Sequence, residues 1–170
     1  MTLARIAALM PPPARPRDTT GDWSAVEAGL GTTLPAEYKA FLSLYGAGLV
    51  SEFLRIFNPL SRNPYLNTEM IFYFRDCYLQ LKTEFPEYCP RDPDSILTWA
   101  MTIDGDSFFW AISGDAPDGW TVGIQSRDQS CEDMTGLTTV AFLEALVEGR
   151  LETPLLPQYF LDEKKTFAPH

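Results

Sequence analysis

Histidine is almost absent from this sequence, and the shortage excludes several kinds of chemistry. The single histidine is His170, at the end of the sequence. Ser-His-Asp catalysis, Cys-His catalysis and histidine zinc sites all need an imidazole held in a fixed place, and terminal residues are commonly poorly ordered. The sequence also lacks the GxxxxGK[ST] and GxGxxG loops that cradle phosphates. We therefore expect a protein that is not an enzyme and needs no cofactor.

Cysteines and long apolar runs are also scarce. The three cysteines, Cys77, Cys89 and Cys131, have no CxxC spacing, and an odd number cannot form a complete disulfide framework. They fit a reducing cytoplasm better than a secreted scaffold or a zinc site. No apolar run approaches the ~20 residues of a membrane-spanning helix, and the N-terminal apolar patch contains Arg5 without a following small-residue cleavage site. We predict a cytoplasmic protein that does not enter a membrane.

Positive charge is the third shortage. The chain has 13 Lys and Arg against 23 Asp and Glu, which gives a net charge of −10 at pH 7. Between residues 84 and 133, eleven acids oppose only two arginines. Such a chain repels nucleic acid and anionic membranes and attracts basic partners. The acidic bias has two alternative roles, attraction of a basic protein partner or solubility alone.

The remaining composition suits one folded domain. The chain has 170 residues, of which 45% are hydrophobic and 13% aromatic, close to the ~100–200 residues of an ordinary domain. The proline-rich stretch "PPPARPRDTTG" predicts an extended linker. We expect an N-terminal helix or tail and linker at residues 1–21, a domain at residues 22–157 and a C-terminal tail at residues 158–170.

Apolar periodicity predicts four helices within that domain. "WSAVEAGL" follows the N-cap candidate Asp22, and "LPAEYKAFLSLYG" has Pro35 in its first turn. A third helix begins near residue 67 and must end before Pro86. The last, "TTVAFLEALVEG", is predicted to be amphipathic, with Thr138 or Thr139 as its cap.

The centre of the chain predicts strands. "EFLRIFNP", "ILTWAMTI", "SFFWAIS" and "WTVGIQS" are rich in β-branched and aromatic residues and are separated by turn residues. Within "SFFWAIS", Phe108 and Trp110 share one face, whereas Phe109 and Ala111 share the other. Because both faces are apolar, we predict a central strand with Trp110 in the core and not in a ligand slot. The order of elements predicts an α+β fold, with a mainly antiparallel sheet and helices packed around it.

The tripeptide Asp104-Gly105-Asp106 lies between two predicted strands and has two interpretations. Paired carboxylates can bind a hard cation, but position 12 of an EF-hand loop would be Asp115 instead of glutamate, and the loop is mostly apolar. Asp-Gly between strands is a strong hairpin signal, because glycine readily adopts positive φ. We predict a hairpin turn without a metal. A metal- or small-molecule-binding enzyme that uses Asp104 or Asp106 stays as a remote alternative.

Three blocks of the sequence, in order, resemble the SUKH superfamily. They are "W..VE..LG..LP.EYK.FL..YG", "LTWAMTIDGDSFFWAISGDAPDGWTVGIQSRD" and the closing "TTVAFLEALVEG", together running from about Asp22 to about Leu155. The sequence departs from the family at "LYGAG", where Asn often precedes the glycine, and in its Pro- and Arg-rich N-terminal extension. The positions that carry the resemblance are Trp23, Leu34, Pro35, Tyr38, Phe41, Gly46, Trp99, Gly105, Trp110 and Trp120.

The resemblance implies a SUKH-like domain without a catalytic centre. The superfamily includes a domain of a fungal cell-wall-synthesis regulator and bacterial immunity proteins that bind and neutralise a toxin, often a nuclease. An acidic inhibitor would complement a basic nuclease surface. We expect a toxin-neutralising binding domain; the alternative is a regulatory or scaffolding interaction domain without a toxin partner. The candidate partner-facing acids are Asp104, Asp106, Asp115, Asp118, Glu132 and Asp133. We expect the turn that contains Asp104 and Asp106 and the turn that contains Asp115 and Asp118 at opposite edges of the sheet.

Overall fold

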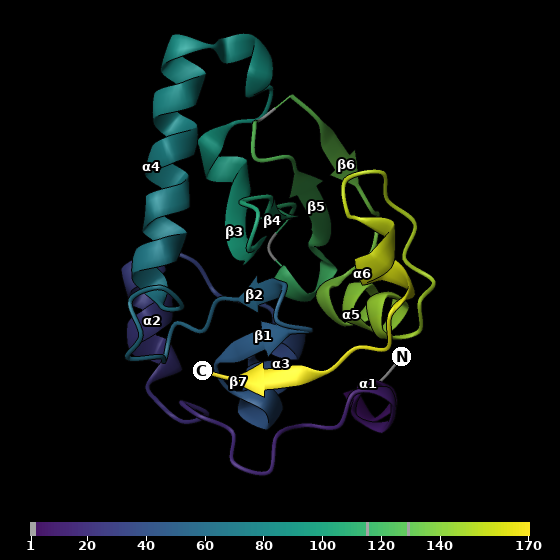
Figure 1. Ribbon diagram of the computed structural model, residues 1–170. Helices are drawn as coiled ribbons and strands as arrows, with labels where there is room; N and C mark the ends of the chain where they lie inside the picture. The colour runs from purple at the N-terminus through teal and green to yellow at the C-terminus, as the bar shows by residue number, and fades with distance from the viewer. Residues whose placement is uncertain (1–2, 115, 129) are drawn as a thin grey trace.

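A seven-stranded antiparallel sheet organises the molecule (Figure 1). The computed structural model describes residues 3–114, 116–128 and 130–170. The strand order is β6-β5-β4-β3-β2-β1-β7, and every neighbouring pair is antiparallel. The predicted α+β fold, in a single domain, is confirmed. The strands are β1 (Gly48–Val50), β2 (Leu54–Ile56), β3 (Ile96–Thr102), β4 (Ser107–Ala111), β5 (Thr121–Gln125), β6 (Glu132–Met134) and β7 (Phe167–Pro169).

Helices cover the two faces of the sheet unequally. In Figure 1, α4 stands on the left of the sheet, and α5 and α6 lie to its right. α4 packs on β3, whereas α5 packs on β5, α1 and α3. Within the described residues, no helix is both long and apolar enough to cross a membrane. The helices are α1 (Leu3–Leu9), α2 (Trp23–Leu30), α3 (Ala36–Tyr45), α4 (Thr68–Glu84), α5 (Thr139–Val147) and α6 (Gln158–Asp162), with short 3-10 turns η1 (Pro86–Tyr88), η2 (Pro93–Ser95) and η3 (Pro117–Gly119).

The predicted hairpin joins β3 to β4. Gly105 lies in the turn with φ of 101°, and the Thr102 N–H donates to the Asp106 carbonyl at 2.8 Å. The hairpin prediction is therefore confirmed. The sequence did not indicate a β-bulge in β3, where the register shifts between Thr98 and Ala100. Because the bulge adds a residue, Thr98 and Met101 both lie opposite β4 residues on the same face of the sheet.

The inner face of the sheet, defined as the face toward α3 and α5, carries the main aromatic core. Trp110 is fully buried, as predicted, and stacks on Trp99 with ring centroids 5.6 Å apart. Tyr38 of α3 meets Trp110 edge-on at 4.9 Å. The Trp110 Nε1–H donates to Thr139 Oγ1 at 2.9 Å, so this buried polar atom is satisfied.

The start of α3 differs from the prediction. Pro35 is at the N-cap position, not in the first turn, and has no side-chain capping bond. The side chain of Asp118, in η3, caps the helix instead. Its Oδ1 accepts a hydrogen bond from the Ala36 N–H at 2.6 Å. A proline cannot cap a helix with its side chain, so the carboxylate comes from a distant segment. By contrast, Asp22 caps α2 locally, as predicted, by accepting from the Ala25 N–H at 3.1 Å.

The start of α5 also depends on another segment. Thr138 is the N-cap residue, as predicted, but its side chain makes no capping bond to the helix. Glu37 of α3 accepts instead from the Val140 N–H and from Thr138 Oγ1, both at 3.4 Å. The amphipathic pattern expected for α5 is wrong, since all its residues from Thr139 to Leu146 are buried. Contacts with α1, α3 and β5 leave it no solvent-facing side over that stretch.

Both ends of the described chain join the same fold, so domain limits at residues 22 and 157 are too narrow. Ile6 of α1 is fully buried, and Arg17 of the predicted linker forms an isolated parallel β-bridge with Gly46. The predicted C-terminal tail forms α6 and β7, which pairs with β1. Phe167 of β7 packs edge-on against Tyr45 at 5.1 Å. Apolar side chains at each end therefore add to the core, which composition alone did not predict.

The positions that carry the family resemblance have structural roles. Gly46 has φ of 73°, and a Cβ there would lie 2.1 Å from the Arg17 carbonyl oxygen, so only glycine fits this approach. Trp23 is half-buried against the core, and Gly105 makes the hairpin turn. The rest are buried: Leu34, Pro35, Tyr38, Phe41, Gly46, Trp99, Trp110 and Trp120.

Candidate functional site

Three of the six predicted partner-facing acids hold the protein's own structure. Asp118 caps α3, as described above. Glu132 forms an ion pair with Arg91, with both carboxylate oxygens 2.9 Å from Nε. This hydrogen-bonded pair raises the pKa of Arg91. The Arg91 guanidinium also lies 5.6 Å from the centroid of the Phe109 ring, which ties the pair to the sheet.

The acids of the β3–β4 turn differ from each other. Asp106 is half-buried; its Oδ2 accepts from Thr102 Oγ1 at 2.9 Å, and its Oδ1 accepts from the Arg127 N–H at 3.1 Å. It is therefore a turn-stabilising residue. Asp104 is exposed and Asp133 half-exposed, and neither side chain has a hydrogen bond or ion pair to any other described residue. Asp115 lies outside the described residues.

The structure does not bring the predicted acids together into one site. Asp106 comes just before β4 and Asp118 follows it, so the two turns lie at opposite ends of that strand. Glu132 lies near the Asp106 end, because Gln125 pairs with both Ser107 and Glu132. Over the part of the chain that the structure describes, no three His, Cys, Asp or Glu residues are grouped as metal ligands.

A different surface stands out, and the sequence interpretation missed it. We call it the α4 ridge and define it as residues 65–88, which comprise α4, its entry and η1. Nine large apolar side chains are exposed among the described residues, and six belong to this ridge. Large apolar side chains that concentrate in an exposed position on one element are candidates for a binding surface. The six are Tyr65, Phe72, Tyr73, Leu79, Phe85 and Tyr88.

The local sequence explains why these side chains face outward. Asn67 caps α4 by accepting from the Glu69 N–H at 2.9 Å, and the helix ends at Glu84, before Pro86. Ile71 and Tyr78 form the buried side of α4, as predicted from their spacing. Phe72 and Leu79 are also seven residues apart, which places them together on the outward side. That second apolar spacing was the signal in the sequence that could have identified the ridge.

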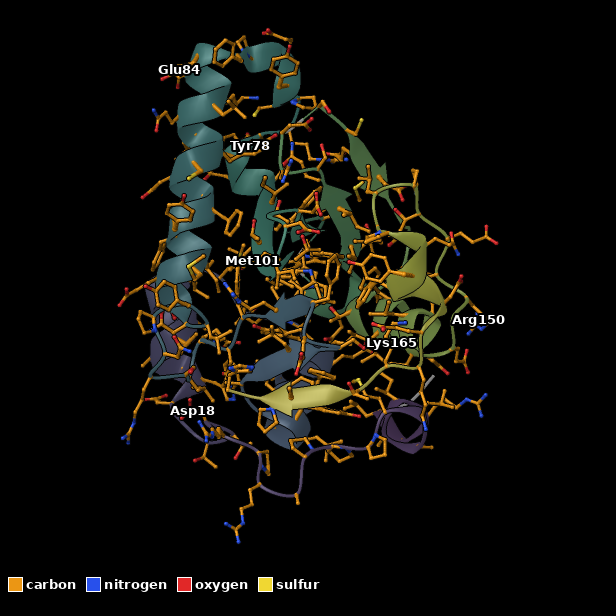
Figure 2. The ribbon with its side chains drawn as sticks, viewed as in Figure 1. Asp18, Tyr78, Glu84, Met101, Arg150 and Lys165 are labelled. Atoms are coloured by element: carbon orange, nitrogen blue, oxygen red, sulfur yellow. The ribbon has the colours of Figure 1, made fainter. Side chains whose placement is uncertain are left out.

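The free charge on the α4 ridge is negative. Its two cations are engaged: Arg75 pairs with Asp94 at 3.0 Å, and Lys82 Nζ donates to two backbone carbonyls at 2.8 and 2.7 Å. Figure 2 shows Glu84 at the far end of α4, where the helix extends past the end of β3. The exposed acids of the ridge are Glu69, Asp76, Glu84 and Glu87.

Protein-family models, curated proteins and solved structures give no match to this chain. Its function is therefore inferred from the chemistry of its own surfaces. Among these the α4 ridge combines two properties, exposed aromatic and aliphatic side chains and carboxylates that form no ion pair with a described residue. A protein interface typically has an apolar centre with a polar rim, and the ridge has the residue types for both.

Proposed function

We propose that this protein is a non-catalytic binding domain that neutralises a basic protein, such as the nuclease domain of a toxin, by covering its surface. The observation that carries the proposal is the α4 ridge, where exposed apolar side chains alternate with free acids. α4 has 17 residues, which corresponds to a rod about 25 Å long. A rod of this length presents several side chains to one partner.

The mixture of residues on the ridge favours a partner rich in Lys and Arg. Aromatic rings accept cations over their faces, and the aliphatic stems of Lys and Arg pack well on apolar surface. Glu84 and Glu87 then offer carboxylates to the charged ends. The net charge of −10 would attract such a partner over a longer range and speed its association.

The toxin-neutralising role draws its support from the SUKH resemblance of the sequence. The alternative, a regulatory or scaffolding domain without a toxin partner, would use the same ridge. Binding to a toxin domain encoded immediately upstream of the gene would support the toxin-neutralising role over the regulatory one. We place the protein in the cytoplasm, in keeping with its three free cysteines.

The test measures binding of that toxin domain to paired variants. Phe72→Ala with Leu79→Ala should weaken binding at least about tenfold, mainly through faster dissociation, because hot-spot side chains often contribute ~2 kcal/mol each. The matched control is Tyr159→Ala, since Tyr159 is 63% exposed but lies on α6. Equal weakening by the control, or none by the ridge variant, would exclude the ridge as the binding surface.

Association rates at several salt concentrations test the electrostatic part. Glu84→Gln with Glu87→Gln should slow association at low salt and have little effect at high salt. The comparison variant, Asp104→Asn with Asp133→Asn, removes the same charge from residues outside the α4 ridge. A rate that does not change with salt, in the wild type, would mean that the acidic bias serves solubility alone.

A further inference from the structure

A cavity of about 310 Å³ lies between α4 and the outer face of the sheet, which is the face toward α4. Tyr73, Phe74 and Tyr78 line it from the helix, and Met101 and Phe109 line it from β3 and β4. Figure 2 labels two of these lining residues, Tyr78 of α4 and Met101 of β3. Ordinary small-ligand pockets occupy about 300–1,000 Å³, so this cavity suits a small molecule.

Three polar side chains form the sheet side of the cavity without partners of their own. Thr98, Ser107 and Gln125 come from β3, β4 and β5 and are 9%, 5% and 3% exposed. None of their side chains makes a hydrogen bond to another described residue. Their polar atoms are not among the fully buried atoms that lack a partner, so they open onto the cavity and are available to a ligand or water.

The cavity also departs from the protein's acidic character. Of its lining residues, all within the described ranges, none is Asp or Glu, and Arg127 is the one cation. The Arg127 side chain is exposed and has no ion pair to a described residue. Two neighbouring acids are engaged, Asp106 by the Arg127 N–H and Glu132 by Arg91, whereas Asp104, next to the lining residue Gly105, is exposed. An anion is therefore not repelled from the cavity by a lining carboxylate.

Ser107, Gln125 and Arg127 gather at one end of the cavity, whereas Thr98 lies toward the other. Ser107 pairs directly with Gln125, and Arg127 follows Gln125 by two residues. Gly105 of the hairpin turn lines the same end. Toward the other end of β4, Phe109 pairs with Thr98, near Ile96 and the aromatic side chains of α4. The cavity thus has a cationic, hydrogen-bonding end and an apolar end.

We infer that this cavity binds a small monocarboxylate with an aromatic or branched aliphatic body. Arg127 binds the carboxylate, since a guanidinium matches its two oxygens. Ser107 and Gln125 donate hydrogen bonds beside it, and Phe109 and Tyr78 hold the apolar body. The site shares Tyr73 with the α4 ridge, whereas Phe72 and Leu79, the residues substituted in the binding test, do not line the cavity.

Calorimetry with three matched probes tests the charge preference. Naphthoate should bind on the order of tenfold more tightly than neutral naphthamide, because its hydrogen bonds are charge-assisted. Cationic naphthylmethylamine should bind most weakly. Arg127→Gln should reduce naphthoate to the affinity of naphthamide, whereas Arg15→Gln removes the same charge from the predicted linker and should change nothing. No binding of naphthoate, or equal affinities for acid and amide, would overturn the inference.

Thiol labelling locates the bound probe. Cys77 is exposed and lines the cavity, so bound naphthoate should slow its alkylation by iodoacetamide. The measurement uses Cys131→Ser, which removes the other exposed thiol. Protection should require more naphthoate in the Arg127→Gln background. Tight binding without protection of Cys77 would place the probe elsewhere and refute the proposed site.

Discussion

The two faces of the sheet are formed by the same strands but have different roles. On the inner face, Trp110 stacks on Trp99 and donates its N–H to Thr139, so both shape and polarity are satisfied. On the outer face, Ser107 and Gln125 are almost as buried but have no side-chain partners among the described residues. The difference teaches that burial alone does not identify a residue's role. The inner face is closed by packing, although Trp99 Nε1 and Trp120 Nε1 have no partner, whereas the polar groups of the outer face open onto a cavity.

The contrast is built into the alternation of a strand. Phe108 and Trp110 of β4 face α5 and α3, while Ser107 and Phe109 face α4. α4 contacts the sheet mainly at β3. It therefore leaves part of the outer face open as the cavity.

The largest expected effect is on the inner face. Trp110→Ala should lower the free energy of unfolding by about 3–5 kcal/mol, the usual cost of deleting a buried large aromatic side chain. Met101→Ala, on the half-buried outer face, should cost about 1 kcal/mol or less. Urea unfolding of both variants measures the difference. Similar losses would abolish the distinction between the faces.

A glycine on the outer face provides the second test. A Cβ at Gly123 would lie 2.3 Å from the Phe109 ring and 2.7 Å from Met134 Sδ. Gly123→Ala should therefore lower the free energy of unfolding by about 1–3 kcal/mol through overpacking. Gly119→Ala is the control, because no atom lies within 4 Å of a Cβ there. An unchanged stability for Gly123→Ala would show that the ring moves freely into the cavity.

The third test compares two acids that sequence reasoning grouped together. Asp118→Ala should cost about 1 kcal/mol of unfolding free energy, because it removes the cap of α3. Asp104→Ala should change stability by less than about 0.5 kcal/mol, as for an ordinary surface site. Thermal unfolding at neutral pH distinguishes them. Equal effects would contradict the capping role of Asp118.

The smallest effect is expected in the loop between β5 and β6. There, a fall in pH should remove the stability that the ionised side chain of Asp128 contributes. Hydrogen bonds from Ser130 and Ser126 lower the pKa of Asp128 from 3.8 to about 2. A lowered folded-state pKa adds stability above pH 3.8, and that stability is lost as the pH falls through about 2. The difference between wild type and Asp128→Asn should thus shrink from pH 5 to pH 2. A difference that grows over this range would exclude the assigned hydrogen bonds as its cause.

Sequence reasoning predicted the inner face better than the outer face. Spacing identified the buried side of α4, and the alternation of "SFFWAIS" placed Trp110 in the core. The Asp-Gly signal gave the hairpin because turn geometry is local. The bulge at Thr98 has no comparable local signal, since it depends on how β3 pairs with β4.

The candidate sites were largely missed for a similar reason. A count of acids cannot tell whether a carboxylate faces solvent or caps a helix, and Asp118 and Glu132 proved to be engaged. The α4 ridge was visible in the spacing of Phe72 and Leu79, but only the inward side of the helix was considered. The cavity joins residues of α4, β3, β4 and β5, so no local pattern could have predicted it.

The long-range helix caps have a consequence for the order of folding. Asp118 and the start of α3 are 82 residues apart in sequence, and Glu37 and the Val140 N–H are 103 apart. Contacts of such separation form late, because the intervening chain must first be ordered. The start of α3 is therefore capped only after the β-meander has brought η3 into place, and the start of α5 only after α3 has packed beside it. Caps that form after the rate-limiting step slow unfolding without speeding folding, so this pair of carboxylates contributes to the lifetime of the native state.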